Sequence, residues 1–168
     1  DLPEAMQLAR LLQRDGIAAP IVSAGGTGTY HITGRREGIT ELQAGSYATM
    51  DAKYEEAHAD FELALSVVAR VISTPTPDLA VIDAGHKTLT IEFGLPRLVK
   101  PEGWKIGGFS EEHAKIVRRG GAPLKRGDRV EIVPSHGCTT INLHDAYWVT
   151  RKDILEAVWP IAARGHIR

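Results

Sequence analysis

Apolar and polar positions near the start of the chain follow a helical pattern. Residues 1–14 carry an apolar stripe that consists of Met6, Leu8, Leu11 and Leu12. Asp1 is placed to cap this predicted helix, and Gly16 follows it where a helix commonly ends. Two short apolar segments come next, residues 19–23 and 39–43, and each runs into a glycine-rich turn. A helix and two strands that end in such turns are typical of an α/β unit with a parallel sheet.

The pattern changes after about residue 55. Residues 61–74 are rich in β-branched side chains and stop at Pro75, which favours a strand over a helix. Further short apolar segments between Gly, Pro and Asp indicate strands over residues 78–82, 130–133, 147–149 and 157–161. We therefore expect two architectural pieces, an α/β piece over residues 1–54 and an antiparallel, β-rich piece over residues 55–168.

Composition narrows the classes of function. The 168 residues hold 20 Lys and Arg against 21 Asp and Glu, and this net charge of −1 excludes a broad basic surface for nucleic acid. We expect no membrane partner and no leader, because no run of about 18 apolar residues occurs and the sequence starts acidic. The single cysteine, Cys138, excludes an intramolecular disulfide and fits a reducing compartment, so we expect a cytoplasmic protein.

The chain has 17 glycines, and two glycine turns are candidates for binding a phosphate. SAGGTGTY (residues 23–30) and QAGSYATMDAKY (residues 43–54) each follow a strand-like segment. Successive backbone N–H groups in such a turn can surround an anion. The first turn lacks both a P-loop lysine and the full GxGxxG spacing, so a plain turn is the alternative. Together, Thr27 and Gly45 with their neighbours could hold one phosphate between adjacent strand ends.

The segment PSHGC, residues 134–138, is a candidate metal site. If it continues a strand, His136 and Cys138 lie on the same face. An imidazole and a thiolate suit Zn²⁺. Two ligands are too few for a closed structural site, so metal would need water or substrate to complete its shell. The alternative is a buried cysteine beside a hydrogen-bonded histidine.

Two further groups of polar residues are weaker candidates. They are Asp83, His86 and Lys87 in VIDAGHKTL, and Glu111, Glu112 and His113 in FSEEHAKI. The alternative for the paired glutamates is a solvated loop or the first turn of a helix, where negative charge is favoured.

Six segments in order, GGTGTY, QAGSYATMDAKY, DAGHK, SEEH, PSHGCTTINLHD and WPIAARG, give the chain a family resemblance. From about residue 20 to residue 168 it resembles the D-threonine aldolase and D-serine dehydratase family, pyridoxal-phosphate (PLP) enzymes of the alanine-racemase fold type. The resemblance implies that residues 1–54 form the last βα elements of a TIM-like PLP-binding barrel. Residues 55–168 would then be the antiparallel β-rich C-terminal domain that carries the metal site. No lysine matches the family's Schiff-base motif, which is expected upstream of Asp1, so we expect the chain alone to be catalytically incomplete.

The resemblance also implies site residues. The PLP phosphate would be held by Gly26, Thr27, Gly45 and Ser46, with Tyr47 beside them. A divalent metal, zinc or manganese, would be held by His136 and Cys138, which are also the expected catalytic residues. Asp83 and His113 are weaker expectations for residues that line the site. In this family the second metal ligand is Cys in dehydratases and Asp in well-known aldolases, so Cys138 leans toward a dehydratase.

The implied function is that of a PLP- and metal-dependent lyase for D-3-hydroxy amino acids. A D-threonine aldolase-like reaction would cleave the Cα–Cβ bond to give glycine and an aldehyde. The alternatives are a zinc-dependent D-serine or D-3-hydroxyaspartate dehydratase and a non-catalytic β-rich binding module. A racemase has no use for a His-x-Cys pair. The expected partners are the substrate, the rest of the barrel and a second copy in a homodimer, because an open barrel edge would expose apolar surface.

Overall fold

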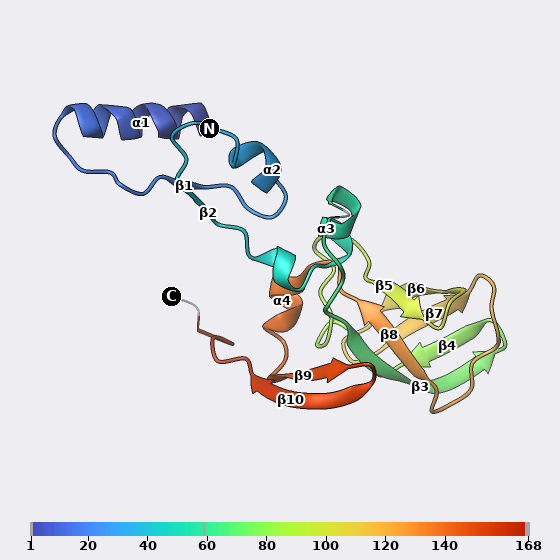
Figure 1. Cartoon of the computed structure of the whole chain (residues 1–168). Helices are drawn as coiled ribbons and strands as arrows, with labels where there is room; N and C mark the ends of the chain where they lie inside the picture. The colour runs from blue at the N-terminus through green and yellow to red at the C-terminus, as the bar shows by residue number, and fades with distance from the viewer. Residues whose placement is uncertain (1, 59, 167–168) are drawn as a thin grey trace.

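The computed structural model describes residues 2–58 and 60–166 (Figure 1). Figure 1 shows the N-terminal elements extending away from a β-rich part. These elements are α1 (Leu2–Arg14), β1 (Ser23–Ala24), α2 (Tyr30–Thr33), β2 (Glu41–Leu42) and the 3₁₀ helix η1 (Ser46–Ala48). The helix α3 (Ala52–Ala57) then leads into the β-rich part.

The predicted first helix is confirmed as α1, although the expected cap, Asp1, lies outside the described residues. The helix ends at Arg14, and Gly16 just beyond it has a φ of +78° and donates its N–H to the carbonyl of Gln13 at 3.1 Å. The two predicted strands are present but shorter, as β1 and β2. They pair in parallel, with Ser23 opposite Glu41, so the predicted parallel pairing is confirmed.

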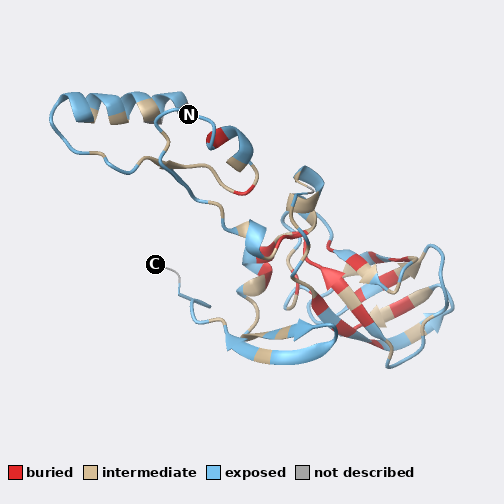
Figure 2. Cartoon of the chain, viewed as in Figure 1, coloured by how far each residue is buried: buried red, intermediate tan, exposed pale blue. Residues whose placement is uncertain are grey.

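Six strands form one antiparallel sheet in the order β5-β8-β3-β4-β7-β6. They are β3 (Val67–Thr76), β4 (Leu79–Ile82), β5 (Arg97–Lys100), β6 (Trp104–Phe109), β7 (Ala114–Arg118) and β8 (Arg129–Val133). The end strands β5 and β6 lie in contact, so the sheet nearly closes into a barrel. Its interior is filled by alternating apolar side chains, which include Val71, Ile82, Ile116 and Ile132 (Figure 2). The predicted antiparallel, β-rich architecture is confirmed.

The strand predicted over residues 61–74 begins later, at Val67. The preceding segment is not free to pair in the sheet, because the N–H groups of Ala64 and Leu65 both donate to the carbonyl of Thr49. The strands β5, β6 and β7 have no counterpart in the sequence prediction, since their short runs contain Lys, Arg or Gly between apolar residues.

After β8 the chain forms the short helix α4 (Gly137–Ile141) and then an antiparallel pair of strands, β9 (Ala146–Arg151) and β10 (Ile154–Pro160). The two strands include the predicted segments at residues 147–149 and most of 157–161. They form a sheet of their own, separate from the six-stranded sheet.

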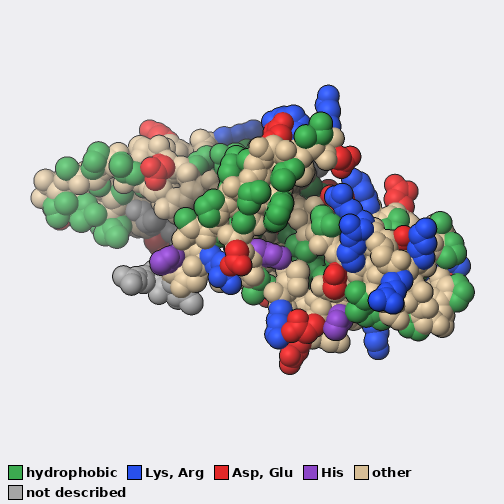
Figure 3. Space-filling view, turned by 90° about the horizontal axis from the view of Figure 1, so that it is seen from below, with side chains coloured by type: hydrophobic (Ala, Val, Ile, Leu, Met, Phe, Trp, Pro, Cys, Tyr) green, Lys and Arg blue, Asp and Glu red, His purple; other side chains and the backbone are tan. Residues whose placement is uncertain are grey.

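The N-terminal elements leave apolar side chains uncovered. Leu8 in the stripe of α1 is 58% exposed, and Ile21 before β1 is 65% exposed. Figure 3 shows hydrophobic side chains gathered at the left-hand end, which the N-terminal elements form. Within the described residues these elements make no closed barrel, so the assignment of residues 1–54 to the end of one stays a prediction. The expected boundary after residue 54 falls inside α3.

No helix in residues 2–58 and 60–166 is both long enough and apolar enough to cross a membrane.

Candidate functional site

The two glycine turns lie side by side, because the strands that precede them are paired. They are also joined directly. The hydroxyl of Thr27, which is only 2% exposed, accepts a hydrogen bond from the backbone N–H of Tyr47 at 3.1 Å. A buried threonine of the first turn thus fixes the backbone of the second.

The joined turns present free backbone donors. Among the described residues, the N–H groups of Thr27, Gly28 and Ser46 donate no hydrogen bond to another group of the chain. A Cβ added at Gly26 or Gly45 would meet no atom within 4 Å, and neither glycine has a positive φ. Within the described part of the chain nothing therefore requires glycine at these positions, whereas a ligand lying against the backbone would.

Gly25 is a different case. Its φ is +78°, and a Cβ there would lie 2.8 Å from the hydroxyl oxygen of Thr33. The chain's own backbone geometry therefore explains this glycine without a ligand.

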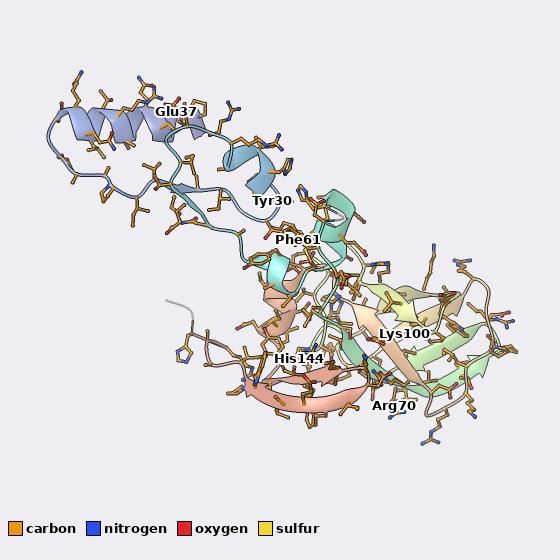
Figure 4. All side chains as sticks on the ribbon, in the orientation of Figure 1. Tyr30, Glu37, Phe61, Arg70, Lys100 and His144 are labelled. Carbon is orange, nitrogen blue, oxygen red and sulfur yellow. The ribbon has the colours of Figure 1, made fainter. Side chains whose placement is uncertain are left out.

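Aromatic side chains hold the first turn against the segment after α3. The Tyr30 hydroxyl donates to Asp60 at 2.6 Å, and this bond, together with burial and the Asp60 charge, raises the pKa of Tyr30. His58 hydrogen-bonds through Nε2 to the carbonyl of Gly28 at 2.7 Å. The ring of Phe61 lies 5.5 Å from those of both Tyr30 and Tyr47 (Figure 4). The candidate phosphate turns are thereby linked to the start of the β-rich part.

The expectation that His136 and Cys138 continue a strand is wrong. β8 ends at Val133, His136 is the residue that precedes α4, and Cys138 lies in the first turn of that helix. The chain leaves the sheet here because its backbone bonds to the start of α3: the Gly137 N–H donates to Asp51 Oδ2 at 2.8 Å. The Cys138 side chain is exposed, so the alternative of a buried cysteine is also wrong.

The His136 ring is held on two sides by neighbouring residues. Its Nδ1 lies 2.7 Å from Glu92 Oε1, and its ring stacks on Phe93 with centroids 4.3 Å apart and 19° between the planes. The same Glu92 oxygen accepts a short hydrogen bond from the Thr139 hydroxyl. Sequence reasoning missed Glu92, which lies 44 positions from His136 in the chain. Its only sequence signal is an acidic residue between two apolar ones, Ile91 and Phe93.

The environment of Glu92 favours its ionised form. Burial opposes ionisation, but hydrogen bonds from Thr139, from the backbone of Glu92 itself, from Thr90 and from His136 outweigh it and lower the pKa of Glu92 to about 2. An ionised carboxylate only accepts hydrogen bonds, so His136 Nδ1 carries the proton of this contact. In a neutral ring, Nε2 then has the free lone pair.

A tyrosine on β9 lies near the thiol. Burial, and then the negative charge of the Cys138 thiolate, raise the pKa of Tyr147. The sequence predicts only that Tyr147 lies in a strand. Its proximity to Cys138 arises from the way β9 folds back on α4, which the sequence pattern does not show.

Asp51 brings the two candidate regions together. Its carboxylate caps α3 by accepting from the Tyr54 N–H at 2.9 Å, and it also holds Gly137, between His136 and Cys138. Asp51 lies three residues after the end of η1, and the Met50 N–H donates back to the carbonyl of Ser46 at 2.7 Å. The second glycine turn and the His-x-Cys segment are therefore neighbours in space.

The remaining candidate residues form a separate exposed group. Lys87 pairs with Glu112, and Asp83 accepts from the Arg70 N–H at 2.7 Å. Glu111 and His113 lie in the turn between β6 and β7, which confirms the interpretation as a solvated loop. No hydrogen bond or ion pair in the described part of the chain joins His86 or any of these residues to His136 or Cys138.

The donor chemistry of the His-x-Cys pair fits a metal site with open positions. It offers one oriented imidazole, with 19% of the side chain exposed, and one exposed thiol. Within residues 2–58 and 60–166, no three His, Cys, Asp or Glu side chains converge as a metal-binding group. Any metal at this pair would need ligands beyond the two side chains.

Solved structures define the class of fold. Alanine racemase from Acinetobacter baumannii is similar over 77% of this chain with a TM-score of 0.54, at 16% identity. An alanine racemase-like protein from Idiomarina loihiensis is similar over 90% of it with a TM-score of 0.72, at 25% identity. The chain therefore has a fold found in alanine-racemase-like proteins.

Sequence comparison assigns the chain to a smaller group of proteins than the fold does. The sequence profile of the putative serine dehydratase domain matches residues 64–150, and the chain belongs to this family.

Characterised relatives are lyases. D-threonine aldolase of Arthrobacter sp is 39% identical over 98% of this chain and 45% of its own length. 3-Hydroxy-D-aspartate aldolase of Paracoccus denitrificans (strain Pd 1222) is 38% identical over 92% of this chain and 42% of its own. D-threo-3-hydroxyaspartate dehydratase of Delftia sp. (strain HT23) is 30% identical over 92% of this chain and 47% of its own. The chain thus spans less than half the length of these relatives.

Solved structures of an aldolase and a dehydratase are also similar to this chain. D-threonine aldolase from Filomicrobium marinum matches 98% of this chain and 47% of its own, with a TM-score of 0.91 and 34% identity. Two variants of D-threo-3-hydroxyaspartate dehydratase match 93% of this chain with TM-scores of 0.80 and 0.79, both at 27% identity. One replaces a histidine and the other a cysteine two positions later, and the cysteine variant is in the metal-free form.

Proposed function

We infer that this chain is part of a PLP- and divalent-metal-dependent lyase that acts on D-3-hydroxy amino acids, with a D-threonine aldolase-like activity. The observation that carries the proposal is its 39% identity to a D-threonine aldolase along 98% of its length. The two candidate regions add support, because the glycine turns with their free backbone donors lie beside the candidate metal ligands His136 and Cys138.

The glycine turns fit the phosphate of PLP. The N–H groups of Thr27, Gly28 and Ser46 would donate to it, and the absence of side chains at Gly26 and Gly45 would let it approach the backbone. Tyr47 would have its backbone fixed by Thr27 and its ring supported by Phe61.

The His-x-Cys pair fits the metal. His136 Nε2 and the Cys138 thiolate would bind it, while Glu92 holds the ring by Nδ1. The pair has the same spacing as the histidine and cysteine replaced in the dehydratase variants, one of which is in the metal-free form.

When bound, PLP supplies an electron sink for charge at Cα, and the metal supplies a Lewis acid for the substrate's 3-hydroxyl. The chain's residues have three tasks around these groups. The turns would bind the phosphate of the cofactor, and His136 and Cys138 would position the hydroxyl of the substrate through the metal. The Asp51–Gly137 hydrogen bond would keep these two binding regions at a fixed separation. The Schiff-base lysine would come from outside these residues.

Aldol cleavage is favoured over dehydration by the relatives. The two aldolases are 39% and 38% identical to this chain, against 30% for the dehydratase. The solved aldolase also superposes better, with a TM-score of 0.91 against 0.80. A zinc-dependent dehydratase remains the second candidate, because Cys138 is the ligand type that points to it.

A chimera tests the reaction. The chain replaces its matching 45% of the Arthrobacter sp aldolase, and the product is assayed with D-threonine, D-serine and D-3-hydroxyaspartate, with and without chelator. We expect glycine and an aldehyde, formed only with metal. Ammonia and a keto acid would assign the dehydratase instead. A soluble chimera that binds neither PLP nor metal would contradict both and favour a binding module.

The expected partners belong to the same proposal. The rest of the barrel would cover the exposed stripe of α1, where Leu8 and Leu11 are 58% and 40% exposed. A second copy would complete a homodimer.

A further inference from the structure

We propose that Glu92 is a positioning residue for the metal site: its carboxylate fixes the His136 ring so that Nε2 is directed to the metal. This inference rests on the proposed function, since it needs His136 to be a ligand. Glu92 lies outside all the sequence motifs named above.

Glu92 and the His136 ring are in direct contact. Glu92 Oε1 lies 2.7 Å from His136 Nδ1 and accepts a hydrogen bond from the Nδ1–H. A histidine that donates one ring nitrogen to a carboxylate has its tautomer and ring orientation set, and its other nitrogen becomes a better ligand. Cys138 lies two positions beyond His136, so fixing the ring also fixes one side of the ligand pair.

The Glu92 carboxylate is itself held in place by α4. The Thr139 hydroxyl donates to the same Oε1, and Thr139 follows Cys138 directly on α4. A single carboxylate oxygen therefore contacts the residues on both ends of the segment His136-Gly137-Cys138-Thr139. The Thr139 hydroxyl also lies 2.8 Å from that of Thr90, which ties the loop of Glu92 to α4.

The Phe93 ring also constrains His136. Phe93 stacks on one face of the imidazole with centroids 4.3 Å apart, which disfavours rotation of the ring about its χ2 bond. Glu92 sets the direction of the ring in its plane, and Phe93 sets the plane.

The test compares metal affinity across variants of the 168-residue chain. Co²⁺ is the probe, because a thiolate ligand gives a charge-transfer band that reports Cys138, and Zn²⁺ competition then gives affinities. We expect affinity to fall about 10-fold in Glu92→Gln, which keeps an acceptor without the charge, and up to about 100-fold in Glu92→Ala. Glu102→Gln is the matched control, since Glu102 is an exposed glutamate of the β5–β6 turn.

A second readout separates positioning from a merely structural role. Nitrogen NMR of the metal-free chain should show His136 with its proton on Nδ1, and a mixture of tautomers in Glu92→Ala. Glu92→Ala should lower the thermal midpoint of the metal-free chain, because it removes the contacts of Glu92 with His136 and Thr139. Co²⁺ affinity is therefore measured at a temperature at which every variant is fully folded.

The outcomes distinguish this inference from the proposed function. If His136→Ala loses Co²⁺ while Glu92→Ala binds it as tightly as Glu102→Gln, the positioning role is wrong and the metal site stands. If the unaltered chain binds no Co²⁺, or if His136→Ala binds it unchanged, both fail together. A Glu92→Ala chain that loses affinity only because its thermal midpoint has dropped would also overturn the positioning role.

Discussion

Asp51 and Gly137 are 86 positions apart in sequence, yet the Asp51 carboxylate accepts a hydrogen bond from the Gly137 N–H at 2.8 Å. Asp51 is 1% exposed, and its carboxylate also caps α3 through the Tyr54 N–H. This contact places the segment that follows the second glycine turn against the centre of the His-x-Cys motif. It is the structural reason that two separate sequence motifs form one candidate site.

Asp51→Ala should therefore be strongly destabilising. It removes a helix cap and leaves a buried N–H without an acceptor, which together cost about 2–4 kcal/mol of the free energy of unfolding. Urea denaturation measures the loss. Asp51→Asn keeps one acceptor oxygen, so it should lose less, about 1–2 kcal/mol. Equal stability of the Asn and Ala variants would contradict the idea that both oxygens contribute.

Much of this fold follows from periodicity. The helical stripe around Leu11 predicts α1, and the β-branched run around Val71 predicts β3. Strands such as β6 could not be predicted, because Gly107 and Gly108 interrupt a run whose pairing with β7 supplies its stability. Local pattern is a weak guide where cross-strand contacts decide the structure.

The candidate site could be predicted only as separate motifs. Gly26, Thr27 and Cys138 stand out in the sequence because of their residue types. Glu92 does not, since an isolated acidic residue has no significance until folding places it 2.7 Å from His136. The error over the strand at His136 has a similar cause: the bond from Gly137 to Asp51 is long-range and overrides the local alternation.

Thr27→Val should weaken the phosphate turns. Valine matches the shape of threonine but leaves the Tyr47 N–H without its acceptor, at a cost of about 1–3 kcal/mol. In the chimera with the Arthrobacter sp aldolase, we expect the variant to bind PLP more weakly, as measured by absorbance titration. Thr27→Ser keeps the hydroxyl and should bind PLP much as the unaltered chimera does. Equal PLP affinity in Thr27→Val would show that the Thr27–Tyr47 bond does not shape the turn.

The stability of the metal-free chain should depend on Glu92 at acid pH. The folded chain lowers the pKa of Glu92 from 4.5 to about 2, so the ionised carboxylate stabilises the fold above pH 4.5. This contribution is lost as the pH falls from about 4.5 to about 2. Glu92→Gln removes the titrating group, so its thermal midpoint should fall less than that of the unaltered chain over this range. The same acid sensitivity in both proteins would contradict the lowered pKa.

Turnover by the chimera that carries His136→Ala tests directly whether His136 and Cys138 bind a catalytic metal beside PLP. We expect its metal-dependent cleavage of D-threonine to be lost, and added Zn²⁺ or Mn²⁺ should not restore it. The PLP absorbance should stay that of the unaltered chimera, because the phosphate turns are intact. Full turnover by His136→Ala in the presence of chelator would contradict the metal assignment.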